Sequence, residues 1–112
     1  MPKQFYRKDR VSELIRKNLA EILLRNIEVD GALITLTEVD VNKDLDRAIS
    51  KISVIPSDKA DRVLEVLEKS RGYLQGILND KINIRPMPKI VFKIDVGPEK
   101  AAGVEKKLLE NK

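Results

Sequence analysis

The residues that most often perform catalysis or bind metals are largely missing from this sequence. Its 112 residues include no cysteine and no histidine. Disulfides, thiolate zinc sites, cysteine nucleophiles, histidine ligands and histidine general bases are therefore excluded. Carboxylates remain as acid–base groups, and their arrangement gives no sign of a pocket. We expect a protein that is not an enzyme and that has no metal site and no cofactor.

One carboxylate pattern is similar to part of a calcium site. Asp40-x-Asn42-x-Asp44 imitates the start of a calcium-binding loop. Such a loop also needs glycine at its sixth position and glutamate at its twelfth, whereas this chain has Leu45 and Lys51 there. Asn and Asp are also common in tight turns. The sequence therefore predicts a hairpin turn at this segment.

The charged residues fall into blocks along the chain. Residues 1–25 include seven basic and three acidic residues, and residues 69–93 include six basic and one acidic. The intervening residues 26–68 include ten acidic and five basic residues. A basic surface attracts polyanions, and an acidic surface opposes non-specific wrapping. The pattern predicts one-sided docking on a nucleic acid, and ordinary solvated surface charge is the alternative.

Cations of the two basic blocks are the candidates for phosphate contacts. They are Lys8, Arg10, Arg16, Lys17, Lys69, Arg71 and Arg85. Arg71 is favoured because the helical pattern weakens around it, and a helix that began there would offer free backbone N–H groups to a phosphate. For Arg85, a structural role beside the following proline is the alternative. Aromatic residues are only 4% of the chain, so a site that stacks many bases is not expected.

The spacing of apolar side chains predicts the first elements. Asp9 can cap a helix over residues 10–25, whose apolar positions repeat at the helical period. Those positions are Val11, Leu14, Ile15, Leu19, Ile22 and Leu23. Strands are predicted over residues 32–41 and 47–55, close enough in sequence for an antiparallel hairpin. In the second strand, one face consists of Ala48, Ser50, Ile52 and Val54.

A second helical stretch is predicted to bend or break in its middle. Pro56-Ser57-Asp58 ends the preceding strand and caps this helix. The apolar pattern weakens at Ser70-Arg71-Gly72, since glycine costs roughly 1 kcal/mol relative to alanine inside a helix. The core positions before this point are Val63, Leu64 and Leu67, with Val66 beside them, and helical spacing resumes with Tyr73, Leu74, Ile77 and Leu78. The stretch is either one kinked helix or two consecutive helices.

The remaining residues complete an α+β domain. Pro86 and Pro88 impose an extended lead-in to a third strand over residues 89–95, in which Phe92 is a predicted core residue. A short terminal helix or tail is predicted within residues 97–112. We expect residues 1–112 to form a single domain with its core in residues 8–96, and its helices to cover one face of the sheet. The order of the strands cannot be deduced.

This order of elements, with particular residues, resembles a known family. It is the order of KH-like domains of type II, which usually grip nucleic acid with a Gly-x-x-Gly loop. The segments Arg-Val-Ser-Glu-Leu-Ile at 10–15 and Ile-Arg-Pro-Met-Pro-Lys-Ile-Val-Phe-Lys-Ile-Asp at 84–95, with the hairpin between 39 and 54, are similar to ribosome-binding factor A. In that family a kinked Ala-x-Gly replaces the loop, and Ser70, Arg71 and Gly72 match it here, with serine in place of alanine.

The resemblance implies a function. It implies transient binding to the immature small (30S) ribosomal subunit, contact with 16S ribosomal RNA (rRNA) and assistance in late maturation of that RNA. It also implies a monomer, a role in cold adaptation and a link to assembly GTPases. The lack of cysteine fits the cytoplasm, and no apolar run is long enough to span a membrane. The alternative is a protein–protein interaction module that uses the acidic hairpin without contacting RNA.

Overall fold

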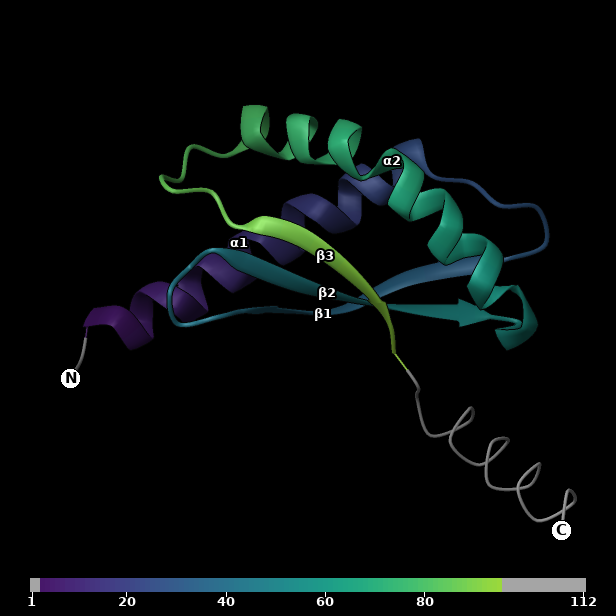
Figure 1. Cartoon of the computed structure of the whole chain (residues 1–112), viewed down its shortest axis with the longest axis horizontal. Coiled ribbons are helices and arrows are strands. Elements are labelled where there is room, and N and C mark those ends of the chain that lie inside the picture. The colour runs from purple at the N-terminus through teal and green to yellow at the C-terminus, as the bar shows by residue number, and fades with distance from the viewer. Residues whose placement is uncertain (1–2, 96–112) are drawn as a thin grey trace, which may run out of the picture.

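The apolar periods of the sequence become two helices and a three-stranded sheet (Figure 1). The computed structural model describes the backbone of residues 3–95 and the side chains of residues 8–95. The elements are α1 (Lys3–Asn26), β1 (Leu33–Val41), β2 (Arg47–Ile55), a 3-10 turn η1 (Ser57–Lys59), α2 (Ala60–Lys81) and β3 (Lys89–Ile94). The α+β class is confirmed. The predicted terminal helix lies outside the described residues.

The sheet has β2 at its centre, in the order β1-β2-β3. β1 and β2 form the predicted antiparallel hairpin, with Leu33 opposite Ile55. β3 runs parallel to β2, with Lys89 opposite Arg47. Parallel strands need a crossover connection, and α2 provides it between β2 and β3.

Both helices lie on the same face of the sheet (Figure 1). α1 packs against β1, α2 packs against β3, and the helices contact each other. The side chains buried beneath them on β2 are Ala48, Ser50, Ile52 and Val54, which share one face as predicted, and Phe92 of β3 is buried as predicted too. Among residues 8–95, no element covers the opposite face. Neither helix combines the length and apolar character that crossing a membrane requires.

Both helices begin at other residues than predicted. α1 starts at Lys3, so Asp9 lies inside the helix instead of capping it. α2 starts at Ala60, because the chain after Pro56 first makes the 3-10 turn η1, in which the Lys59 N–H donates to the Pro56 carbonyl. Lys59 then occupies the N-cap position without a side-chain capping bond. The caps predicted at Asp9 and at Pro56-Ser57-Asp58 were therefore wrong.

Two residues that match the predicted helical spacing lie at the surface. Leu14 is 40% exposed and Tyr73 is 66% exposed. In each case a neighbouring residue occupies the buried side of the helix, namely Ile15 on α1 and Leu74 on α2, and both are fully buried. The apolar face of each helix is therefore narrower than the sequence pattern indicates.

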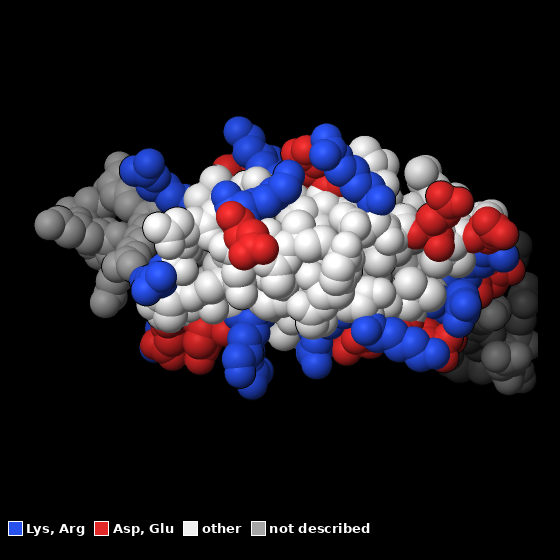
Figure 2. All heavy atoms as spheres, turned by 90° about the horizontal axis from the view of Figure 1, so that it is seen from above, with Lys and Arg blue, Asp and Glu red and all other residues white. Residues whose placement is uncertain are grey.

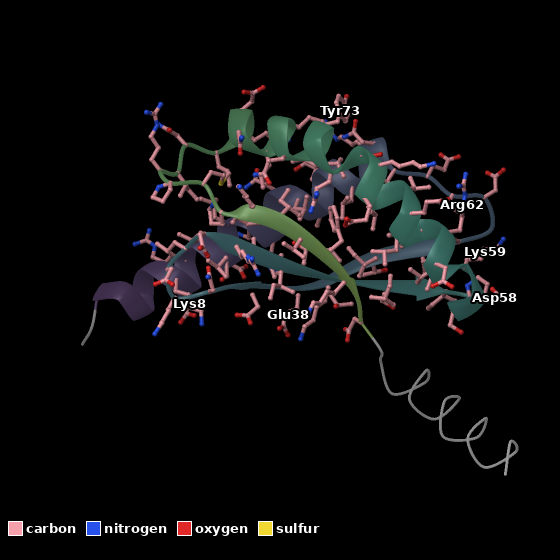
Figure 3. The ribbon with its side chains drawn as sticks, viewed as in Figure 1. Lys8, Glu38, Asp58, Lys59, Arg62 and Tyr73 are labelled. Carbon is pink, nitrogen blue, oxygen red and sulfur yellow. The ribbon has the colours of Figure 1, made fainter. Side chains whose placement is uncertain are left out.

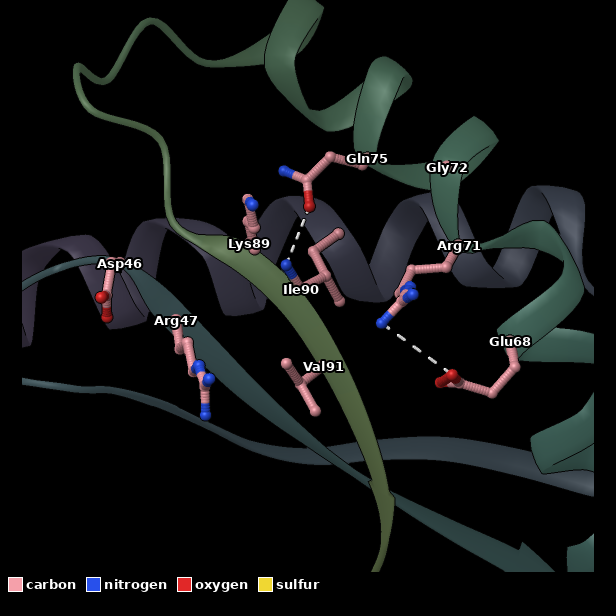
Figure 4. Close-up of a pocket in the computed structure, with 9 residues that line it drawn as sticks. All are labelled: Asp46, Arg47, Glu68, Arg71, Gly72, Gln75, Lys89, Ile90 and Val91. Atoms are coloured by element: carbon pink, nitrogen blue, oxygen red, sulfur yellow. Dashed lines mark hydrogen bonds and ion pairs between the residues drawn. The ribbon is translucent and has the colours of Figure 1, made fainter.

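α2 is one continuous helix across Gly72, which excludes two consecutive helices. This also removes the helix N-terminus expected at Arg71, because N–H groups inside a helix are bonded to the preceding turn. The helix axis nevertheless changes direction part-way along (Figure 1), and Gly72 lies at this change (Figure 4). Glycine is a common point of helix bending. The predicted kink is therefore a bend within one helix.

One side chain fastens the turn between β1 and β2. Oδ1 of Asn42 accepts hydrogen bonds from the backbone N–H groups of Asp46 and Arg47, each at 3.0 Å, and its Nδ2 donates to the Asp46 carboxylate. Leu45 in this turn has a left-handed backbone, with φ of 60°. The calcium-like pattern is thus the predicted hairpin turn. Within residues 8–95, no group of three acidic side chains is arranged as metal ligands.

We expect Asn42→Ala to lower the free energy of unfolding by about 1–2 kcal/mol, because two backbone donors lose their acceptor and each hydrogen bond contributes roughly 1 kcal/mol. Urea denaturation measures the change. Lys43→Ala, in the same exposed turn, is the matched control and should stay within about 0.5 kcal/mol of the original chain. Equal losses for the two variants would show that the turn does not depend on the Asn42 carboxamide.

Candidate nucleic-acid interface

A groove of about 680 Å³ separates the middle of α2 from the beginning of β3 (Figure 4). α2 provides one wall at its bend, and the first residues of β2 and β3 provide the other. The lining residues are Asp46, Arg47, Glu68, Arg71, Gly72, Gln75, Lys89, Ile90 and Val91. Ile90 and Val91 are apolar, while most of the other side chains are charged. Ile90 is buried, so half-buried Val91 is the apolar side chain at the groove surface, between charged groups.

Gln75 joins α2 to the edge of β3. Its Oε1 accepts a hydrogen bond from the backbone N–H of Ile90 at 2.8 Å, and its Nε2 lies 3.3 Å from the carbonyl oxygen of Pro88 as a donor. β3 is an edge strand, whose outward backbone groups lack a strand partner. The carboxamide supplies the missing donor and acceptor at the start of this edge. Gln75 thereby fixes how far α2 stands from β3, and hence the width of the groove.

Three cations surround the groove, one from each of α2, β2 and β3. Arg71 points from α2 into the space beside β3 (Figure 4), where it lies 3.9 Å from the Glu68 carboxylate. Arg47 and Lys89 are opposite each other in the parallel register, which places their backbones about 5 Å apart. Both are exposed and make no ion pair within residues 8–95. An exposed pair such as Arg71–Glu68 contributes under about 1 kcal/mol, so all three cations are open to an anionic ligand.

The structure divides the predicted site residues between two regions. Arg71 and Gly72 line the groove, and Lys69 and Ser70 directly precede them on α2. Arg85 lies exposed in the loop between α2 and β3. The remaining predicted cations, Lys8, Arg10, Arg16 and Lys17, lie on α1. α1 packs on β1, at the opposite edge of the sheet from β3.

Two of the α1 cations already have acidic partners. Arg16 Nη2 lies 2.7 Å from a Glu13 carboxylate oxygen, and this hydrogen bond lowers the pKa of Glu13. Lys8 lies 4.0 Å from the Asp40 carboxylate on β1. These exposed pairs are as weak as Arg71–Glu68, so they do not exclude α1 as a phosphate site. The groove is the stronger candidate because cations from three elements line one hollow there.

The surface seen from above α2 is not uniformly basic. Figure 2 shows uncharged atoms along the middle of this face, with Lys and Arg next to Asp and Glu around its rim. A polyanion laid flat on this face would meet mixed charge.

Sequence reasoning missed Arg47, Lys89 and Gln75. Arg47 and Lys89 each stand at the start of a strand, and only the parallel pairing of β2 with β3 brings them together. The position of Gln75 on α2, one turn of helix from Arg71, was the one available signal. Its role depends on the contact between α2 and β3, which the sequence did not reveal.

Comparison with known proteins gives a consistent result. The family model for ribosome-binding factor A matches residues 7–108. A ribosome-binding factor A of Synechococcus sp. (strain CC9311) is 38% identical over 102 residues, covering 88% of this chain and 76% of the relative. A Thermotoga maritima protein described as a candidate ribosome-binding factor A, solved by NMR, is 26% identical with a TM-score of 0.69, over 84% of this chain and 92% of that one.

The fold also matches a homology model of Thermus thermophilus ribosome-binding factor A that was fitted into a cryo-EM map of a 30S complex. That match has 20% identity and a TM-score of 0.64, and it covers 75% of this chain and 90% of the other. The similarity at this level concerns the fold. With a family model matching most of its length and a relative at 38% identity, this chain belongs to the ribosome-binding factor A family.

Proposed function

We propose that this chain is a binding factor for the small ribosomal subunit and that it contacts the RNA of that subunit. The observation that carries the proposal is the convergence of Arg47, Arg71 and Lys89 on one groove at the bend of α2. Membership in the ribosome-binding factor A family supports it, as does the Thermus thermophilus relative placed in a 30S complex. A role without catalysis is consistent with a chain that lacks histidine and cysteine.

The mechanism we propose is recognition of RNA shape. Phosphate contacts fix the position and orientation of a protein on RNA without reading its sequence. The three groove cations would hold phosphates, and the bend of α2 would determine which RNA backbone fits between α2 and β3. Flanking contacts would come from Lys69 and Arg85 near the groove and from the α1 residues Lys8, Arg10, Arg16 and Lys17. RNA is commonly recognised by shape in this way.

The proposal extends to the role of this binding. We include binding to immature subunits, assistance in late maturation of 16S rRNA, a role in cold adaptation, cooperation with assembly GTPases, and action as a cytoplasmic monomer. These parts follow from the family resemblance. The groove between α2 and β3 is the site that we propose for the contact.

The protein-interaction alternative has less support. The acidic residues Glu38 and Asp40 of the hairpin lie within ion-pair distance of Lys51 and Lys8, at 3.4 and 4.0 Å. Their charge is therefore partly balanced within the domain. These exposed pairs are weak, so the main support for the ribosomal role over this alternative is the cationic groove and the family to which the chain belongs.

Site-directed crosslinking tests the proposal, because the chain lacks cysteine and each introduced cysteine is unique. Lys69→Cys, next to the groove, and Arg62→Cys, near the start of the same helix (Figure 3), would carry a photoreactive group. On immature small subunits, we expect Lys69→Cys to attach to rRNA at one mapped region and Arg62→Cys to attach much less. Attachment of Lys69→Cys to proteins alone would favour the protein-interaction alternative.

A further inference from the structure

The face of the sheet turned away from the helices carries a block of positive charge. The side chains of β2 and β3 that alternate with the buried ones are Arg47, Ile49 and Lys51 on β2, and Lys89, Val91 and Lys93 on β3. Figure 3 shows Glu38, the β1 neighbour of Lys51, pointing away from the helices on this face. No element among residues 3–95 covers it.

The register arranges these cations in two pairs. Arg47 stands opposite Lys89 and Lys51 stands opposite Lys93, and one apolar pair lies between them. Residues two apart on a strand are about 6.6 Å apart, and neighbouring strands are about 4.8 Å apart. The two pairs stand four residues apart on each strand, about 13 Å along the sheet, which is roughly twice the step between successive phosphates of an RNA strand, and the apolar pair between them leaves surface for a sugar.

The carboxylates on this face lie on β1 or already interact with another side chain of the described residues. Glu38 lies 3.4 Å from Lys51, and Asp40 lies 4.0 Å from Lys8. Asp95 accepts a hydrogen bond from the Thr37 hydroxyl at 2.8 Å. Both side chains of the Lys51–Glu38 pair are exposed to solvent, so the pair is weak and a phosphate can replace it. Arg47, Lys89 and Lys93 make no ion pair within residues 8–95, so the unbalanced charge lies along β3.

This charge is continuous with the groove. Arg47 and Lys89 line the groove and also begin the two rows on the uncovered face. An RNA strand held by Arg71 at the bend of α2 would therefore meet Lys89 and Arg47 next, and then Lys93 and Lys51. A protein strand added to the edge of β3 fits less well, because Gln75 already occupies the first outward backbone groups of that edge.

We propose that the uncovered face of the sheet is a second RNA-binding surface, on which Lys51 and Lys93 continue the phosphate contacts that begin in the groove. The inference rests on the proposed function and extends it. The domain would hold one RNA backbone around the β3 edge, from the helical side to the open side of the sheet.

The test is Lys51→Gln/Lys93→Gln, whose binding to purified small ribosomal subunits would be measured by fluorescence anisotropy across a range of salt concentrations. We expect a loss of roughly tenfold in affinity and a salt slope flatter by about 2, one for each phosphate contact. The matched control is Lys59→Gln/Arg62→Gln at the far end of α2 (Figure 3), which removes the same charge. Equal losses in both variants would mean that only net charge matters, and the inference would fail.

The other outcomes separate the inference from the proposed function. If Lys51→Gln/Lys93→Gln binds as well as the original chain while Arg71→Ala/Lys89→Ala binds weakly, the RNA ends at the groove and only the inference is lost. If neither double variant weakens binding, both proposals fail. A crosslinker on Lys93→Cys adds a direct readout, in which attachment to rRNA supports the inference. Attachment to ribosomal proteins alone overturns it.

Discussion

Gly72→Ala is expected to make the domain more stable and its binding to small subunits about tenfold weaker, a loss of ~1.4 kcal/mol. A methyl group at Gly72 would meet no atom within 4 Å in the isolated domain. Alanine is favoured over glycine in a helix by roughly 1 kcal/mol, so the free energy of unfolding should rise by up to that amount. Gly72 lines the groove at the bend of α2, where the methyl group and a straighter helix would both hinder a bound RNA backbone.

Gly76→Ala is the matched control. Gly76 lies one turn later on α2, a methyl group there also meets nothing within 4 Å, and the residue does not line the groove. Urea denaturation should show a similar gain in stability for both variants, while anisotropy with small subunits should show a loss of binding for Gly72→Ala alone. If the two variants bind equally well, the glycine at the bend has no part in recognition, and the groove loses its strongest geometric argument.

The structure shows which parts of the sequence pattern were informative. The alternation in β2 correctly placed Ile52 and Lys51 on opposite faces of the strand, because side chains on a strand alternate strictly. The helical patterns were less exact. Leu14 and Tyr73 matched the helical spacing, but the sheet beneath each helix buries only part of the apolar face that this spacing predicts. Both side chains therefore stay exposed. Helix starts were the weakest predictions, since Asp9 and Asp58 resemble caps and neither serves as one.

The candidate site could be predicted only in part, for a topological reason. Arg71 and Gly72 were identified because a local feature, the weakened helical pattern, marks them. Arg47 and Lys89 have no such mark, and they become neighbours only because β3 runs parallel to β2. Strand order depends on the packing of the whole chain, which a charge profile does not contain. Counting charges along the sequence places Arg47 in the acidic block of residues 26–68. In the fold, however, Arg47 lines the groove together with Arg71 and Lys89.

The second large effect is expected for Arg71→Ala/Lys89→Ala, which removes one cation from each wall of the groove. If each side chain contacts one phosphate, the plot of log affinity against log salt should flatten by about 2 units. The free energy of unfolding should change little, because exposed charges usually contribute under about 1 kcal/mol. Binding to purified small subunits across a range of salt concentrations measures the slope. Thermal denaturation checks that this double variant folds like the original chain.

Lys106→Ala/Lys107→Ala removes the same charge from the C-terminal segment and serves as the control for net charge. If it flattens the slope as much as the groove variant does, long-range attraction explains the effect and the groove is not a specific site. Lys69→Ala defines the edge of the site, since Lys69 lies next to the groove without lining it. A further loss when Lys69→Ala is added to the groove variant would place a third phosphate beyond the bend. An unchanged slope would confine the contact to the space between α2 and β3, where Gln75 sets the width and only a backbone of matching shape can reach both cations.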